Sequence, residues 1–134
     1  MTASLSALAL YTGLLGLIAL WLLANVGKRK AKAKVSIGDG GDMNVIRAMR
    51  GQLNFMENVP LALIILLIIS AMNAPVWIIH VSGILLVVGR FFHAWHFIQD
   101  DAPGWQRALG ALTAFLVIAI CSLGLIGHGI YGML

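Results

Sequence analysis

Four polar residues recur at helical spacing within an otherwise apolar stretch. Arg47, Arg50, Asn54 and Glu57 are separated by three, four and three positions, so on a helix of 3.6 residues per turn they share one face. Glu57 lies about 10 Å beyond Arg50 along such a helix, at 1.5 Å per residue. In a membrane-crossing helix that depth is costly for a carboxylate, which then faces the bundle interior or a wet cavity. The stripe therefore predicts a polar site inside a membrane protein.

Two later segments carry further cations. Arg90 and His93 lie one helical turn apart, Phe97 continues their face, and Arg107 opens the last apolar segment. If these segments run antiparallel to their neighbours, all four residues end at the height of the stripe. The sequence then predicts a pocket that contains several cations, one deep carboxylate and an amide.

The charge balance of this pocket leaves two interpretations open. Several arginines around one carboxylate leave excess positive charge, which favours an anionic ligand. A zwitterion with more acid than amine would place carboxylates on arginine and its ammonium on Glu57. Alternatively, Glu57 pairs with an arginine of a neighbouring helix and only holds the bundle together.

Metal and thiol chemistry receive little support from the sequence. His93 and His96 have i, i+3 spacing, but no third ligand of suitable type lies nearby, and we expect no metal site. The single cysteine, Cys121, lies in an apolar run. We expect it to be buried as a small hydrophobic residue.

The composition indicates which elements position these residues. Of 134 residues, 60% are hydrophobic and 10% are charged, whereas a soluble domain has about 25% charged residues. Four apolar segments, each long enough to span a bilayer, predict a single all-α domain over residues 1–134. The expected spans are 5–26, 43–72, 76–97 and 105–131. Short connections such as Asn73–Pro75 favour an up-down four-helix bundle.

Local signals mark the second span. Asp42 or Asn44 is expected to cap its first turn, because these side chains accept hydrogen bonds from free backbone N–H groups. Glycines and aspartates at 38–42 are typical of a turn-rich loop before it. Pro60 lies inside the span, and a membrane bundle tolerates a proline there.

The charges gather on one side of such a bundle. The net charge is +4, and five of the nine basic residues form the run Lys28, Arg29, Lys30, Lys32 and Lys34. This run directly follows an apolar span, so we expect a juxtamembrane cytoplasmic loop rather than a nucleic-acid-binding surface. The positive-inside rule then predicts a cytoplasmic charged face and periplasmic termini.

The segment Arg47–Pro60, which reads RAMRGQLNFMENVP, resembles the signature of the membrane-associated proteins in eicosanoid and glutathione metabolism. Arg50, Asn54, Glu57 and Pro60 meet its pattern of Arg, Asn, Glu and Pro. Gly89–Phe97, GRFFHAWHF, is similar to a second conserved stretch of the family. The Gly-Asp-Gly-Gly element before the signature resembles the small bacterial inner-membrane branch.

The resemblance implies a homotrimer of four-helix subunits that bind glutathione between subunits, open to the cytoplasm. It implies glutathione contacts at Arg50, Gln52, Asn54, Glu57, Arg90 and His93, and a thiolate-stabilising role for Arg107. The implied reactions are thiol conjugation to lipophilic electrophiles and reduction of lipid hydroperoxides. Glutathione serves as co-substrate, and the other partners are membrane lipid and a lipophilic small molecule.

Three positions depart from the family pattern. Asn58, His93 and Phe97 stand where catalytic members commonly have tyrosine. The leading hypothesis is a glutathione transferase or peroxidase of the inner membrane. The alternative is a non-catalytic glutathione- or lipid-binding scaffold of the same fold, because a fold does not grant catalysis. A small transporter is a third hypothesis, and the lack of an inverted repeat in the sequence disfavours it.

Overall fold

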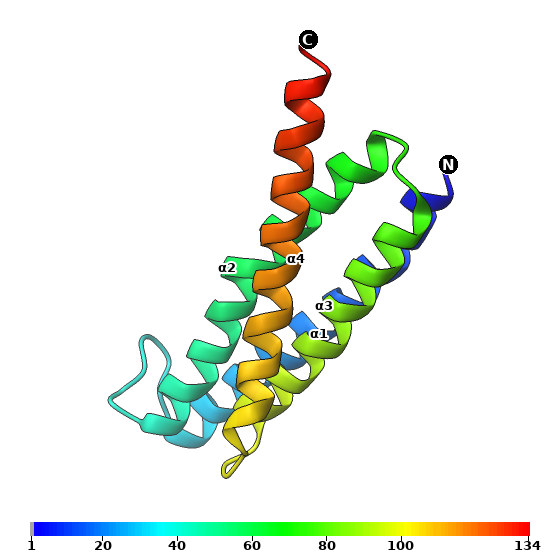
Figure 1. The fold of residues 1–134 in the computed structure, drawn as a ribbon. Coiled ribbons are helices and arrows are strands. Elements are labelled where there is room, and N and C mark those ends of the chain that lie inside the picture. The colour runs from blue at the N-terminus through cyan, green and yellow to red at the C-terminus, as the bar shows by residue number, and fades with distance from the viewer. Residues whose placement is uncertain (1) are drawn as a thin grey trace.

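The computed structural model describes residues 2–134 and contains four long helices. They are α1 (Ala3–Ala33), α2 (Met43–Ala71), α3 (Val76–Ile98) and α4 (Gly104–Tyr131) (Figure 1). Each is long and apolar enough to cross a membrane. The predicted all-α, four-span membrane bundle is confirmed.

Side-chain caps begin the first two helices. The Thr2 hydroxyl accepts a hydrogen bond from the Leu5 N–H at 3.3 Å. Asp42 accepts from the N–H groups of Asn44 and Val45 at 2.8 and 3.1 Å, so Asp42 rather than Asn44 caps α2. These bonds satisfy backbone donors that have no partner within the helix.

The helix α1 is longer than the sequence suggested. The basic run after Val26 was expected in a loop, but Lys28–Ala33 continues the helix, so that expectation is wrong. Alanine and lysine have high helix propensity, and nothing in the run breaks the helix. α1 ends at Ala33, and the residue that follows, Lys34, caps it in a left-handed conformation with φ of 56°.

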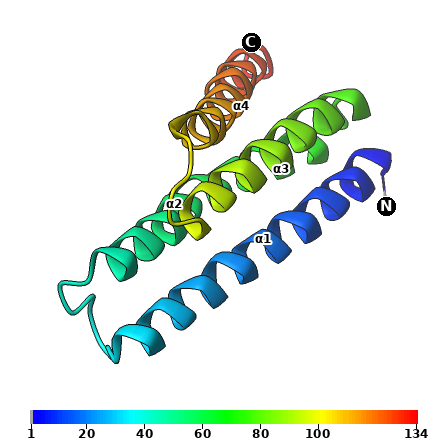
Figure 2. The same cartoon turned by 90° about the horizontal axis from the view of Figure 1, so that it is seen from below.

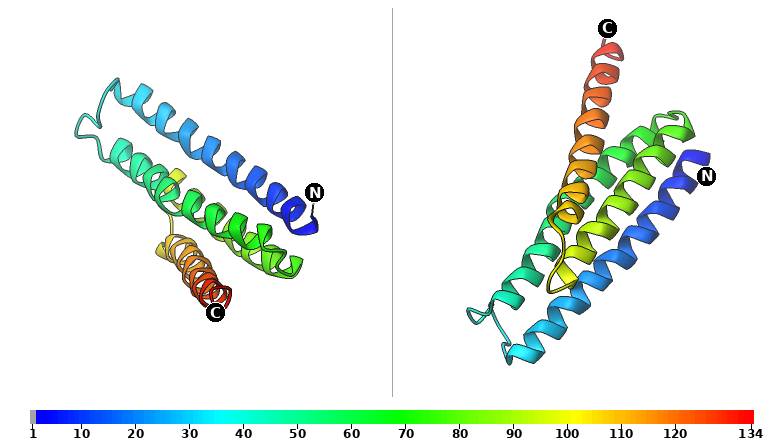
Figure 3. Two further views of the ribbon diagram at one scale, coloured as in Figure 1. Left: turned by 90° about the horizontal axis from the view of Figure 1, so that it is seen from above. Right: turned by 60° about the horizontal axis from the view of Figure 1, so that its bottom comes forward.

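The four helices form a layered bundle in which α2 and α3 lie between α1 and α4. Both middle helices contact α1 and α4, whereas α1 and α4 share no close contact within residues 2–134. The views from below and above show α1 and α4 on opposite sides (Figures 2 and 3). The termini and the α2–α3 turn lie at one end, and the other two loops lie at the opposite end (Figure 1).

The ends of the bundle differ in charge. Every charged side chain lies within 28–57 or 90–107, and these segments lead into or out of the α1–α2 and α3–α4 loops. The opposite end, with both termini and the α2–α3 turn, carries no charged side chain. The charged side chains therefore lie toward one end of the bundle, as the sequence predicted.

Small residues bring α3 and α4 together near the charged end. A Cβ on Gly110 would lie 2.6 Å from the Gly89 carbonyl oxygen, and a Cβ on Gly89 would overlap the Thr113 side chain. Membrane helices commonly approach through such small residues, because apolar side chains gain little by leaving lipid. This close crossing holds the first turns of α4, with Arg107, beside α3.

Apolar side chains fill the interior and cover the outer surface. Leu15, Leu22, Leu66, Ile79 and Leu86 are almost fully buried. Cys121 is also buried, as expected, with its sulfur 3.7 Å from the Ser82 hydroxyl. Outward-facing leucine, isoleucine and phenylalanine residues are largely exposed along all four helices, which suits a surface solvated by lipid.

Candidate functional site

A polar cavity of about 610 Å³ lies between α2, α3 and α4 near the charged end of the bundle. This volume is within the roughly 300–1,000 Å³ of small-molecule sites. Its lining residues are Arg47, Arg50, Leu53, Asn54, Glu57, His93, Phe97, Arg107, Ala108 and Ala111. The cavity therefore joins the predicted stripe on α2 with residues from the end of α3 and the start of α4.

Three charged residues that line this cavity are exposed: Arg50, Glu57 and Arg107. The one salt bridge that forms among residues 2–134 joins Arg29 and Asp100 instead. Within the subunit, the alternative in which Glu57 pairs with an arginine is thus not realised. The three groups remain available to a ligand, and the cationic ones outnumber the carboxylate.

Arg90 lies behind the cavity and holds Asn54. Its Nη1 donates a hydrogen bond to the Asn54 Oδ1 at 2.7 Å, and the residue is only 1% exposed. Its Nε and Nη2 have no hydrogen-bond partner among the described residues. Arg90 therefore fixes the amide of Asn54, and its positive charge lies beneath the cavity rather than on its wall.

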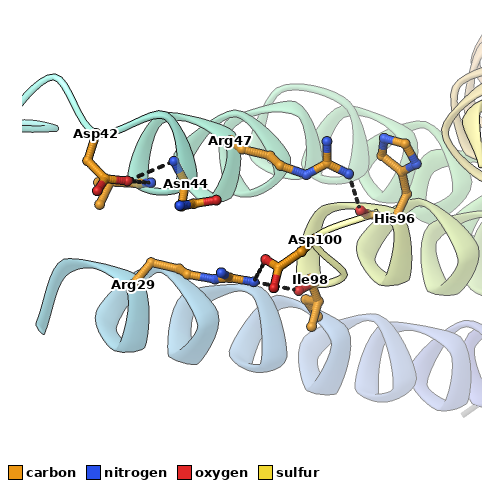
Figure 4. Close-up of polar contacts among 8 residues, drawn as sticks. Arg29, Asp42, Asn44, Arg47, His96, Ile98 and Asp100 are labelled. Carbon is orange, nitrogen blue, oxygen red and sulfur yellow. Dashed lines mark hydrogen bonds and ion pairs between the residues drawn. The ribbon is translucent and has the colours of Figure 1, made fainter. Parts of the chain in front are cut away.

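The ring of Phe97 forms part of the wall and packs between two polar residues. The Arg47 guanidinium lies 5.7 Å from the centre of this ring, and the His93 ring centre lies 5.0 Å from it. Arg47 also donates a hydrogen bond to the His96 carbonyl oxygen at 2.7 Å (Figure 4). Arg47 is thereby engaged in joining α2 to α3, unlike Arg50.

A second set of contacts fixes the loop that leads into α4. Arg29 of α1 donates to the Ile98 carbonyl at 2.9 Å and pairs with Asp100 at 2.7 Å (Figure 4). His96 Nδ1 lies 3.1 Å from the Pro103 carbonyl oxygen, so its N–H donates there. These bonds tie the end of α3 and the α3–α4 loop to the bundle, just before Arg107.

Two of the predicted glutathione contacts do not line this cavity. Arg90 is buried behind it, and Gln52 opens onto a separate cavity of about 420 Å³ on the α1–α2 side. Lys30 and Asp39 also line this second cavity, and Arg50 borders both. Arg50, Asn54, Glu57, His93 and Arg107 are brought together as the sequence predicted.

Two glycines outside the predicted set of site residues shape the wall of the polar cavity. A Cβ on Gly51 would lie 2.7 Å from the Phe97 Cβ, and a Cβ on Gly110 would overlap the His93 side chain. A glycine inside a helix costs about 1 kcal/mol relative to alanine. The presence of glycine at two positions inside helices, despite this cost, was the sign in the sequence that close packing requires a residue without a side chain there.

The chain is similar to known membrane proteins. The model of the MAPEG family matches residues 8–127. The chain is 32% identical over 117 residues to the inner membrane protein YecN of Escherichia coli K12, covering 86% of this chain and 88% of that protein. YecN of Escherichia coli O6:H1 matches equally.

No solved structure shows a significant match. The four apolar helices and the inner membrane relatives together support an integral inner membrane protein. The family model covers most of the chain, including every residue that lines the polar cavity. The chain belongs to the MAPEG family, the membrane-associated proteins in eicosanoid and glutathione metabolism.

Proposed function

We propose that the chain is a glutathione-dependent membrane transferase or peroxidase that acts on lipophilic electrophiles or lipid hydroperoxides. The observation that carries this proposal is the set of exposed, unpaired charges of Arg50, Glu57 and Arg107 around one cavity. In a family associated with glutathione, this charge pattern matches a peptide with two carboxylates, one ammonium and one thiol.

Each charged group has a distinct task in this proposal. Arg50 binds a glutathione carboxylate, and a bidentate arginine contact gives orientation as well as affinity. Glu57 accepts hydrogen bonds from the ammonium. The amide of Asn54, oriented by Arg90, contacts the peptide backbone, and His93 offers a ring nitrogen from the α3 side.

Arg107 stabilises the thiolate. A free thiol has a pKa of about 8.5, and only its thiolate is a good nucleophile. A guanidinium beside the sulfur favours the charged form and lowers the pKa of the thiol. The thiolate sulfur then forms a bond to an electrophilic carbon. With an aryl halide the carbon–halogen bond breaks and halide leaves, and with an activated alkene the π electrons move to the neighbouring carbon, which takes a proton from water. With a hydroperoxide the thiolate attacks the terminal oxygen, the O–O bond breaks, and the leaving alkoxide takes a proton from water to become an alcohol. The resulting sulfenic acid then reacts with the thiol of a second glutathione to give a disulfide and water.

A homotrimer completes the site in this proposal. Gln52 and Lys30 line a cavity on the other side of Arg50. One subunit alone therefore does not bring them to the polar cavity. A neighbouring subunit supplies them when its α1–α2 side faces that cavity. The lipophilic acceptor arrives from the surrounding lipid, and glutathione arrives from the cytoplasm, the side that the positive-inside rule assigns to the charged end.

A non-catalytic scaffold is the second candidate, and two contacts favour it. The Asn58 amide donates to the Asn54 carbonyl at 2.8 Å, so it is already engaged within α2. Phe97 presents a ring without a hydroxyl to the cavity. Such a protein would bind glutathione or lipid and release it unchanged.

Turnover by the purified full-length protein separates these candidates. The protein is incubated with glutathione and a panel containing an aryl halide, an activated alkene and a lipid hydroperoxide. We expect the wild type to consume thiol with at least one acceptor. The Glu57→Ala variant should consume little thiol, which would show that consumption depends on the polar cavity. Glutathione binding without turnover across the panel would favour the scaffold.

A further inference from the structure

A third cavity, of about 360 Å³, lies between the last turns of α1 and the α3–α4 loop. Trp21, Asn25, Lys28 and Lys32 line it from α1, and Ile98 and Asp100 line it from the other side. None of its lining residues belongs to the proposed glutathione cavity or to the cavity beside Gln52. It is therefore separate from the two cavities used in the proposed reaction.

The charges in this cavity leave a positive excess. Lys28 and Lys32 are one turn apart on the same face of α1, and both are exposed. The only carboxylate in the lining, that of Asp100, is paired with Arg29 at 2.7 Å. Because Arg29 neutralises Asp100, the two lysines remain available to an anion.

A buried amide provides an independent sign of a ligand. Asn25 is 8% exposed, lines the cavity, and its Nδ2 has no hydrogen-bond partner among residues 2–134. A buried polar group without a partner is unfavourable, and such groups usually bind a ligand or water. Asn25 lies about one turn from Lys28, and both residues line this cavity from α1.

The depth of the cavity fits the headgroup layer of a bilayer. α1 has 31 residues and is about 46 Å long at 1.5 Å per residue, whereas the hydrocarbon core is about 30 Å thick. Its last turns therefore extend into the headgroups. Trp21, whose ring packs 5.7 Å from that of Phe91, lies about 10 Å deeper than Lys28. Tryptophan favours that border between headgroups and acyl chains.

We propose that this cavity binds the phosphate of an anionic phospholipid. Lys28, Lys32 and the Asn25 N–H contact phosphate oxygens, and Trp21 with the apolar face of α1 contacts the acyl chains. Basic pockets beside membrane helices bind anionic headgroups in this way. The bound lipid also lies against Asp100, in the loop that precedes α4.

Native mass spectrometry of the full-length protein, released from micelles with phosphatidylglycerol or phosphatidylcholine, tests this proposal. We expect the wild type to retain phosphatidylglycerol and not phosphatidylcholine. Near a membrane surface each lysine is worth about fivefold in affinity, so the double change Lys28→Gln and Lys32→Gln is expected to weaken retention about 25-fold. Excess inorganic phosphate is expected not to displace the lipid.

The control is the double change Lys30→Gln and Lys34→Gln, which removes the same charge at the same spacing outside this cavity. It should weaken retention much less. Asn25→Leu keeps every charge and should also lower the retention of phosphatidylglycerol. This variant provides the test if the lysine variant does not fold. Equal loss in the two lysine pairs, equal retention of phosphatidylcholine, or displacement by phosphate would overturn the proposal.

Discussion

Replacing Arg107 with Ala is expected to lower turnover about 100-fold or more, because removing one electrostatic stabiliser of a developing charge typically costs that much. Arg107 is exposed to the cavity and free of salt bridges in the described chain. Its removal therefore breaks no ion pair of the fold, and under the proposed function its charge acts on the ligand. The affinity for glutathione should change little, because the proposal assigns the contacts with the rest of the peptide to Arg50 and Glu57.

The thiolate absorbance of bound glutathione gives the direct readout for Arg107. In the Arg107→Ala variant, the midpoint of its pH titration should rise toward the ordinary thiol pKa of about 8.5. Arg107→Lys keeps the charge and should restore part of the shift. Arg50→Ala should show the reverse pattern. It should weaken glutathione binding, while the thiol of the glutathione that still binds should titrate with the wild-type midpoint. If Arg107→Ala leaves the titration unchanged, Arg107 does not stabilise the thiolate.

Replacing Asn54 with Leu is expected to lower the free energy of unfolding by about 3 kcal/mol, because it leaves a buried charge without its hydrogen-bond acceptor. The Arg90 guanidinium is 1% exposed, and Asn54 Oδ1 at 2.7 Å is its one partner among the described residues. The measurement is unfolding in mixed micelles, followed by circular dichroism.

Arg90→Met provides the control, because it removes the buried charge together with its need for a partner. This variant should lose less stability than Asn54→Leu. Adding Arg90→Met to Asn54→Leu should recover part of the loss, since pairs in contact are not additive. Independent, additive effects of the two changes would contradict the assignment of Arg90 as the group that holds Asn54.

The sequence allowed the bundle and part of the lining of the polar cavity to be predicted. Apolar length and one-sided charge were sufficient for the four spans, because bilayer thickness fixes the length of a spanning helix. The spacing of Arg50, Asn54 and Glu57 predicted a shared face, because the helical period is regular. All three residues line the same cavity in the structure.

Other features depended on tertiary contacts that periodicity does not encode. Nothing in the spacing of Arg90 distinguished a cavity wall from a buried position behind Asn54. Gln52 is two residues from Arg50 and so points to a different side of α2. A basic run after a span is typical of a loop, but the lysines and alanines of this run favour a helix, and α1 continues through Ala33.

Calorimetric titration of glutathione into the detergent-purified, full-length protein tests the central proposal most directly. We predict saturable binding in the wild type and a loss of about tenfold or more in Arg50→Ala and Glu57→Ala, since a charge-assisted hydrogen bond is worth about 1.5–3 kcal/mol. Lys28→Gln, outside the cavity, is the control and should bind as the wild type does. Absence of binding in the wild type, or unchanged binding in both cavity variants, would contradict the proposal that this cavity takes glutathione.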